Sequence, residues 1–286
     1  MVSSSDAQQG GSSSLFAQQG VAIPRLFNFD LPRLRQTGQA WPEQADVSGI
    51  HRVLDIASGT GEWAVLAAQA YPQVQIVGIE RDAQLVESAR AQVHARGVEN
   101  VSFAVMDPFE SLDLPEGTFD LVNARYIVGL LLAGAWPRVL QEFVRVSRPG
   151  GVIRLIENDL PITSGSAFEK LSAMISRAFF QTKRSFSPDG RLLSITPMLK
   201  RLLQDAGCQQ VQQAVSVANF SADMPAHGEL CQDFAQTYRL VQPFLIGTGV
   251  AKQEEVEQLY QQMLSEMQSE RFRANGLSMT VWGTRP

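Results

Sequence analysis

The residues with the clearest chemical potential lie in one short stretch, RVLDIASGTGEW, which spans Arg52–Trp63. An apolar run ends there in Asp55, and two glycines, Gly59 and Gly61, precede the next apolar run. A glycine turn between a strand and a helix lets a ligand come close to backbone N–H groups and to the helix N-terminus. The segment GTGEWA fits the pattern G-x-G-x-x-G/A, which predicts an adenosyl ligand without separating a nicotinamide dinucleotide from another one.

Acidic residues around this turn narrow the choice of ligand. Glu80 ends the next apolar run 19 residues after Gly61, close to the ~20 residues expected for a carboxylate that binds ribose hydroxyls. Asp107 ends a third run, where it could meet an adenine amino group. Asp55 precedes the turn, where it would repel the pyrophosphate of a dinucleotide but would suit a cofactor that carries an ammonium and a sulfonium group.

These residues lie in a regular alternation of expected strands and helices. Short apolar runs predict strands at 51–56, 74–80, 101–107, 118–124 and 152–159, and helical spacing predicts helices at 62–71, 83–97 and 136–151. Asp82 is expected to cap the second of these helices, which closes on Gly97. Strands that alternate with helices imply βαβ units and a parallel sheet covered on both faces.

The second half of the chain departs from this alternation in two insertions, at about 161–195 and 221–275. Both contain segments with an apolar helical face. A predicted helix at 196–207 and a strand at 209–220 separate them, and a terminal strand at 277–286 closes the chain. Extra core packing and a lid over the binding site both explain such insertions.

Together, these motifs resemble, in order and spacing, those of the class I S-adenosylmethionine-dependent methyltransferases. The stretches that carry the resemblance are VLDIASGTGEW, VGIERD, VMDPF, FDLVNAR and VSRPGG, which cover about Arg52 to Asp159. The resemblance implies an α/β, Rossmann-like, seven-stranded and mostly parallel sheet with the last strand inserted antiparallel. From the organisation of the chain we also expect helical lid insertions after strands five and six, an N-terminal tail and cap segment over 1–48, and a methyltransferase domain over 49–286.

S-Adenosyl-L-methionine is the cofactor that the resemblance implies, and five residues would surround its methionine end. Asp55 would organise the turn and the methionine amine. Ala57, Gly59 and Gly61 would line the cofactor with backbone, although Ala57 departs from the glycine that is commoner in the family. Asn123, expected just past the fourth strand, would offer its carbonyl oxygen to the amine.

Five further residues would surround the adenosyl end of the cofactor. Glu80 would hold both ribose hydroxyls, and Arg81 beside it could stack near the adenine. Asp107 would reach the adenine N6, while Pro108 and Phe109 would form walls around the base.

Candidate catalytic residues are harder to identify, because the reaction needs a base only where the acceptor is protonated. His227 is the candidate base among three histidines, since His51 opens the first strand at the wrong end of the sheet and His94 lies late in a surface helix. Tyr126 and Glu157 follow or end strands that point to the cleft. A solvated loop histidine and ordinary polar strand ends explain the same residues.

Missing motifs favour a small-molecule acceptor. The chain has no [DNS]-PP-[YFW] run after the fourth strand and no Pro-Cys pair, and Asn123 with Asp159 would make a poor magnesium site, so no metal is expected. A net charge of −5 without a basic block argues against nucleic acid. Aromatic and methionine residues of the insertions favour an apolar metabolite or natural product, methylated on O, N or C: Phe168, Met174, Phe179, Phe180, Phe186, Met224, Phe234, Tyr238, Phe244, Met263 and Met267.

A cofactor-binding protein of the same fold that catalyses another reaction, such as a cyclisation, remains the alternative. A nicotinamide oxidoreductase is disfavoured, because Leu130 stands where a lysine would follow Tyr126. The longest apolar run, Tyr126–Trp136, is shorter than the ~20 residues that span a bilayer, and the opening 20 residues do not resemble a signal peptide. With two isolated cysteines, the sequence predicts a soluble, cytoplasmic protein that does not bind membranes. Arg25–Arg35 is expected to pack near the cofactor mouth.

Overall fold

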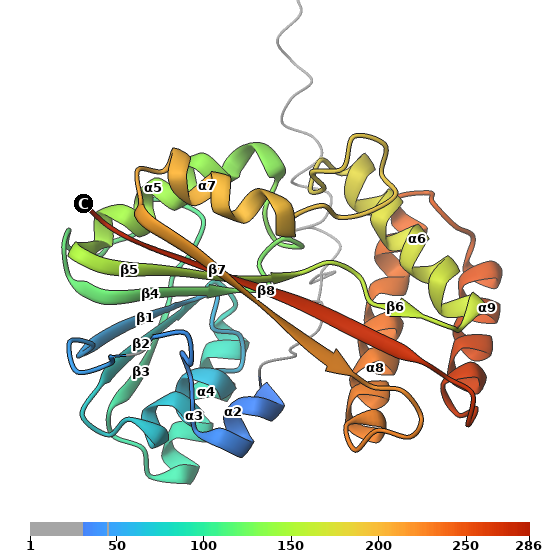
Figure 1. Ribbon diagram of the computed structural model, residues 1–286, viewed down its shortest axis with the longest axis horizontal. Coiled ribbons are helices and arrows are strands. Elements are labelled where there is room, and N and C mark those ends of the chain that lie inside the picture. The colour runs from blue at the N-terminus through green and yellow to red at the C-terminus, as the bar shows by residue number, and fades with distance from the viewer. Residues whose placement is uncertain (1–30, 45) are drawn as a thin grey trace, which may run out of the picture.

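A mixed eight-stranded sheet organises the computed structural model, which describes residues 31–44 and 46–286 (Figure 1). Its strands are β1 (Arg52–Ile56), β2 (Gln75–Glu80), β3 (Val101–Val105), β4 (Phe119–Arg125), β5 (Ser147–Asn158), β6 (Ile162–Thr163), β7 (Gln209–Asn219) and β8 (Ala274–Thr284). The first five are parallel in the order β3-β2-β1-β4-β5. β8 runs antiparallel between β5 and β7, which confirms the predicted antiparallel insertion of the last strand.

The predicted Rossmann-like α/β class is therefore confirmed, and the eighth strand is the short β6. β6 pairs with Ala274 and Asn275 of β8, and β7 pairs with the same Asn275. Since a strand has two edges, β6 must lie on the β5 side of β8. It thus lengthens that side by two residues without changing the topology.

Helices cover both faces of the parallel part of the sheet (Figure 1). Buried side chains of α2 (Leu31–Thr37), α3 (Glu62–Ala70) and α4 (Ala83–Arg96) form one apolar cluster with β1, β2 and β3. Those of α5 (Trp136–Val146) and α7 (Leu199–Asp205) belong to a second and larger cluster. Two short 3-10 turns, Ala133–Ala135 and Thr196–Met198, precede α5 and α7.

Local signals at α4 are confirmed, whereas the predicted end of α5 is wrong. The Asp82 side chain accepts hydrogen bonds from the N–H groups of Gln84 and Leu85, and Gly97 closes the helix with φ of 61°. α5 ends at Val146 instead of 151, and the following residues begin β5. Ser147 pairs there with Phe119 of β4, so strand pairing overrides the local helical pattern.

Three helices of the two insertions pack together beyond the carboxyl ends of the parallel strands (Figure 1). They are α6 (Ser166–Gln181), α8 (His227–Gly247) and α9 (Gln253–Met267). Side-chain hydrogen bonds hold the insertions in place. Glu266 of α9 accepts from the N–H of Ala167 at the start of α6, and Asp159, which follows β5, accepts from Ser194 N–H at 2.8 Å. No helix in the described ranges is long and apolar enough to cross a membrane.

The segment from Leu31 to Gln44 packs against α3. Leu34 and Trp41 are buried, and the Trp41 ring stacks on Tyr71 with centroids 4.5 Å apart. Arg35 of α2 forms ion pairs with Glu62 at the start of α3 and with Glu229 of α8. The prediction for Arg25–Arg35 can be followed only from residue 31, because residues 1–30 of the proposed N-terminal segment lie outside the described residues.

Candidate functional site

The turn between β1 and α3 is built on three left-handed residues. Ala57, Gly59 and Gly61 have φ of 50°, 59° and 78°. A Cβ on Gly61 would lie 2.5 Å from Cζ of Phe103 and 2.8 Å from Cβ of Ala89. Glycine is therefore needed at this position both for the backbone conformation and for the close approach of the turn to β3 and α4.

The Glu80 carboxylate lies directly beside this turn. Its Oε2 accepts a hydrogen bond from Gly59 N–H at 3.1 Å, and its Oε1 accepts from the N–H groups of Arg81 and Asp82 at 2.9 and 3.2 Å. Glu80 is 8% exposed, while the Arg81 side chain is exposed. Besides ending β2, Glu80 thus ties the ends of β1 and β2 together, a structural role that the sequence pattern did not predict.

The segment after β3 lies next to the end of β2. The N–H of Met106 donates to the carbonyl of Glu80 at 3.0 Å, which places the two strand ends side by side. Asp107 is exposed, and its Oδ1 accepts from Phe109 N–H at 2.9 Å in a tight turn. Pro108 and Phe109 are buried. Two carboxylates, the buried Glu80 and the exposed Asp107, therefore lie at the neighbouring ends of β2 and β3.

A row of buried polar side chains crosses the sheet from Asp55. Asn123 and Arg154 occupy the paired positions on β4 and β5. Asn123 Nδ2 donates to Asp55 Oδ1 at 2.8 Å, and Arg154 donates to Asn123 Oδ1 at 2.8 Å while it also forms an ion pair with Glu43. The expected position of Asn123 just past the fourth strand is wrong, because it lies inside β4 with its side chain bound in this row.

Arg125 completes the charge balance of this row. Its Nε lies 3.8 Å from Asp55 Oδ1, and its guanidinium carbon lies 4.8 Å from the centroid of the Trp63 ring. Two buried carboxylates, Asp55 and Glu43, are thereby matched by two buried guanidinium groups, as burial of charge requires. Arg154 and Glu43 were not predicted from the sequence, although an arginine within the apolar run of β5 was an available signal.

Tyr126 and Glu157 lie together where β4 and β5 end. Tyr126 is buried, has φ of 55°, and donates its N–H to the carbonyl of Ile156 at 2.7 Å. Glu157 Oε1 accepts from the N–H groups of Ile127 and Val128 at 2.7 and 3.1 Å. Glu157 therefore holds the left-handed bend that follows β4, where strain in a non-glycine residue often accompanies function.

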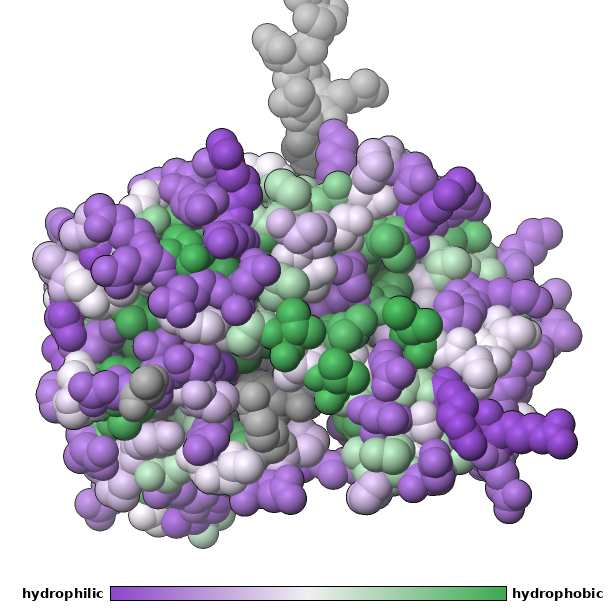
Figure 2. Space-filling view, viewed as in Figure 1, coloured by the Kyte–Doolittle hydropathy of each residue, from purple (hydrophilic) through white to green (hydrophobic). Residues whose placement is uncertain are grey.

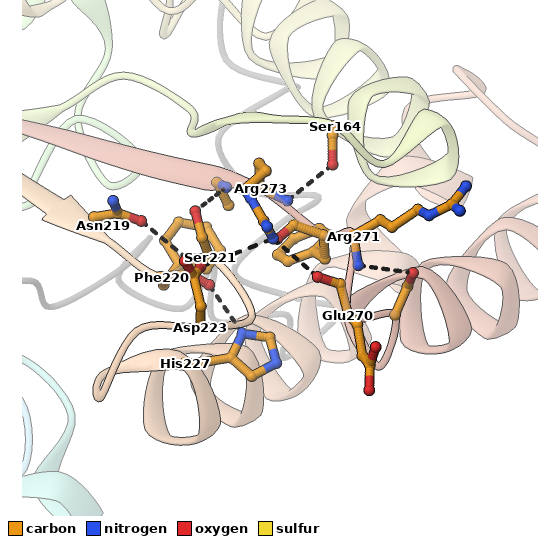
Figure 3. Close-up of polar contacts among 12 residues, drawn as sticks. Ser164, Asn219, Phe220, Ser221, Asp223, His227, Glu270, Arg271 and Arg273 are labelled. Carbon is orange, nitrogen blue, oxygen red and sulfur yellow. Dashed lines mark hydrogen bonds and ion pairs between the residues drawn. The ribbon is translucent and has the colours of Figure 1, made fainter.

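His227 belongs to a different group, at the point where the second insertion joins β7 and β8. Its Nδ1 lies 2.9 Å from the carbonyl oxygen of Phe220 and 3.4 Å from Cys231 Sγ. Figure 3 shows the ring below the loop of Phe220 and Asp223, with Arg273 above that loop. Donation from Nδ1–H to Phe220 leaves Nε2 as the basic nitrogen. Burial raises the pKa of the Cys231 thiol to about 11, so this thiol is neutral at neutral pH.

Most apolar residues considered as acceptor lining form the core of the insertions. Phe168 contacts Phe234 and Tyr238 with ring centroids 5.3 and 5.0 Å apart, and Tyr238 shares a 2.6 Å hydrogen bond with Ser172. Burial raises the pKa of Tyr238 far above its ordinary value. The buried members are Phe168, Phe179, Phe234, Tyr238, Phe244, Met263 and Met267, while Met174 and Phe186 are partly buried and Phe180 and Met224 are exposed. Core packing thus explains the buried set.

The carboxyl ends of β1, β2 and β3 carry the polar groups that can bind a ligand. The Glu80 and Asp107 carboxylates can accept from hydroxyl or amino groups, and the turn offers N–H groups at the start of α3. Among the residues that the structure describes, no three His, Cys, Asp or Glu side chains are grouped so that they could hold a metal ion.

Comparison with known proteins gives this arrangement a class. Residues 53–151 match the family model of a methyltransferase domain. The chain is 26% identical over 191 residues to a demethylmenaquinone methyltransferase of Bacillus cytotoxicus, which covers 62% of this chain and 79% of that protein. It is 32% identical over 130 residues to the demethylmenaquinone methyltransferase of Thermus thermophilus, covering 46% of this chain and 54% of that protein.

Solved structures share the fold. A putative methyltransferase of Bacillus halodurans has a TM-score of 0.56 at 19% identity, with 91% of this chain and 100% of that chain covered. A phosphoethanolamine N-methyltransferase 2 of Haemonchus contortus, solved with S-adenosyl-L-methionine, has a TM-score of 0.51 at 17% identity, with 88% of this chain and 52% of that chain covered. The chain carries a methyltransferase domain. It is an S-adenosylmethionine-dependent methyltransferase, an enzyme whose cofactor is S-adenosyl-L-methionine.

Proposed function

We propose that this enzyme transfers the methyl group of S-adenosylmethionine to an oxygen, nitrogen or carbon atom of an apolar small molecule. The observation that carries the proposal is the Glu80 carboxylate, held at the end of β2 beside the Gly59 turn. A carboxylate there can accept hydrogen bonds from two ribose hydroxyls. The relatives named for demethylmenaquinone make a quinone the first acceptor to test, and a metabolite or natural product of similar polarity the wider class.

The adenosyl end of the cofactor would lie between the ends of β2 and β3. In this proposal Glu80 holds the ribose, and Asp107 binds the adenine amino group. Pro108 and Phe109 form an apolar wall beside the base, and the exposed Arg81 side chain covers it. The adjacency of the two strand ends, fixed by the Met106 N–H bond to Glu80, supports this placement.

The methionine end would lie against the turn itself. Ala57, Gly59 and Gly61 would contact the cofactor through their backbone, because alanine and glycine have little or no side chain. All three have a positive φ. Asp55 is completely buried, so it acts through the groups bound to it, Asn123 and Arg125, and sets the charge of the sheet beneath the turn.

S-Adenosylmethionine supplies an activated methyl group on a sulfonium, so the protein must orient the acceptor and exclude water. Orientation of this kind can contribute on the order of 7–11 kcal/mol. We assign Glu157 as a positioning residue that holds the bend at Tyr126, next to the acceptor. Where the acceptor is a hydroxyl, His227 would take the proton and Tyr126 would lie beside the acceptor. The insertions at 161–195 and 221–275 would close over the acceptor as a lid.

Titration of Glu80 variants with S-adenosylmethionine tests the cofactor assignment. Loss of hydrogen bonds to a charged acceptor costs about 1.5–3 kcal/mol each, so Glu80→Ala should weaken binding roughly ten- to a hundredfold, and Glu80→Gln should lie between. Glu87→Ala, on the exposed face of α4, is the matched control and should bind as the wild type does. Because Glu80 also binds three N–H groups, circular dichroism must show that each variant is folded.

Three outcomes would contradict the proposal. Unchanged affinity in folded Glu80→Ala, or tight binding of NADH by the wild type, would remove the cofactor assignment. S-Adenosylhomocysteine should form when the wild type is incubated with S-adenosylmethionine and demethylmenaquinone or a short-chain analogue. Binding of S-adenosylmethionine without S-adenosylhomocysteine formation from any apolar acceptor would favour a non-methylating reaction, such as a cyclisation.

A further inference from the structure

β7 is an edge strand of unusual exposure. It has eleven residues, QQVQQAVSVAN, with no charged residue and no proline. Nine of the eleven are exposed and none is buried. Val215 and Val217 are 58% and 62% exposed, and Leu277 on the paired strand β8 is 40% exposed. Figure 2 shows apolar side chains gathered in the middle of this face, over the region where Figure 1 places β7 and β8.

The opposite edge of the same sheet is protected. β3 has only five residues, and Arg90 of α4 donates from Nε and a terminal nitrogen to the carbonyl of Phe103 at 3.3 and 2.9 Å. Short length and side-chain cover are common ways to prevent edge-to-edge pairing. β7 has neither: within residues 31–44 and 46–286, β8 is the only strand paired with it.

We propose that β7 pairs antiparallel with β7 of a second copy of this chain, around a two-fold axis at Ser216. The regular ladder of β7 with β8 runs from Gln212 to Asn219, because the register shifts before Gln212. An axis at Ser216 places Val215 opposite Val217 of the second copy and Val217 opposite its Val215. Both exposed valines then form cross-strand pairs on one face, and Ala214 meets Ala218 on the other.

Self-pairing suits this strand because every residue then meets a residue of the same strand. A charged residue near the axis would lie opposite the same charge of the second copy and destabilise the pair. β7 avoids this repulsion because it contains only valine, alanine, serine, glutamine and asparagine. A two-fold arrangement is also closed, so it uses the edge in both copies and leaves none for further growth. Specific interfaces usually bury about 1,200 Å² or more, so α7 and α8, next to the two ends of β7, must add to the contact.

Lysine substitution on the strand tests the interface. The wild type should sediment as a dimer with twice the chain mass of 31.4 kDa. Val215→Lys/Val217→Lys places four like charges around the axis and should sediment at the mass of one chain. Val105→Lys, at a 52% exposed position on the opposite edge strand β3, is the matched control and should remain a dimer. A monomeric wild type, a species larger than a dimer, or a double variant that stays dimeric would each overturn the proposal.

A cysteine series tests the axis independently. Paired residues of antiparallel strands have Cα atoms about 4.5–5.5 Å apart, within the span of a disulfide. Ser216→Cys should therefore form an intermolecular disulfide under mild oxidation. Gln213→Cys should not, because its own copy lies six residues along the pair, about 20 Å away. The wild type, with Cys208 and Cys231, measures the background. Cross-linking of Gln213→Cys at the rate of Ser216→Cys would contradict this axis.

Discussion

The strand-end region around the glycine turn and the helical insertions are held together by different interactions. Buried polar groups in the first region are aligned by the sheet, as Asp55, Asn123 and Arg154 are on three neighbouring strands. The interior of the second region is built from aromatic contacts, such as those of Phe168 with Phe234. Strand register fixes neighbouring groups at intervals of about 5 Å, whereas apolar packing tolerates exchange of residues of similar volume.

This difference separates two tasks within one enzyme. A cofactor site built on strand ends cannot shift without moving the strands that carry it. An insertion whose interior depends mainly on volume can change its outer surface while its core stays packed. We therefore expect substitutions in the strand-end region to be more costly than matched substitutions in the insertions.

The largest effect should follow the loss of Arg154. Arg154→Met leaves the Glu43 carboxylate buried without its cation, and removal of one partner of a buried ion pair costs about 3–5 kcal/mol. In the insertions, Tyr238→Phe removes only the hydrogen bond to Ser172 and should cost about 1–2 kcal/mol. Urea denaturation followed by circular dichroism measures both. Equal losses for the two variants would remove the contrast between the regions.

An intermediate effect is expected at Gly61. Gly61→Ala combines a left-handed backbone with overlap of the new Cβ with the Phe103 ring, and should lower the free energy of unfolding by about 2–4 kcal/mol. Gly97→Ala is the matched control, because Gly97 has φ of 61° and nothing within 4 Å of the same Cβ position. It should lose only the backbone part, about 1–2 kcal/mol. Phe103→Leu should partly rescue Gly61→Ala, and equal costs at both glycines would contradict the packing role.

The smallest effect on stability should occur at Arg35, which joins the two regions. Its ion pairs with Glu62 and Glu229 are partly exposed, so Arg35→Gln should cost less than about 1 kcal/mol of unfolding free energy. The N-terminal turn of α8 should nevertheless exchange its amide hydrogens faster, because this link to α3 is lost. Burial and Glu229 raise the pKa of Asp233, and Arg35 opposes that change, so the variant should raise it further.

Hydrogen exchange of residues 227–233, measured by mass spectrometry, checks this link. Arg191→Gln is the control, since Arg191 pairs with Asp189 inside one exposed loop and should leave that exchange unchanged. Equal amide exchange in the Arg35→Gln variant and in the wild type would show that α8 is held by its apolar contacts alone.

Features that depend on neighbouring residues in the chain could be predicted from the sequence. The parallel strands, the Asp82 cap and the close at Gly97 follow from local patterns, and so does the glycine turn with Glu80 at the next strand end. The antiparallel position of the last strand came instead from resemblance to a family.

Features that depend on pairing between distant segments could not be predicted. The bond between Asn123 and Arg154 exists because β4 and β5 adopt one register, which no local pattern encodes. The end of α5 was misplaced for the same reason, since pairing with β4 draws Ser147 into a strand. Amphipathic spacing placed Phe168 on a helical face, but only the fold shows that this face meets other aromatic rings.

The position of β8 has a consequence for how the chain is made. β8 leaves the ribosome after the other seven strands of the sheet, yet it lies between β5 and β7 and pairs with both. The β3-β2-β1-β4-β5 part can assemble while synthesis continues, because all of its strands have already emerged. β7 joins the sheet only when β8, which ends at Thr284, has been synthesised and can pair with it. The helices between β7 and β8 can dock only then. Vectorial synthesis therefore orders the two regions in time, with the strand-end region first and the second insertion last.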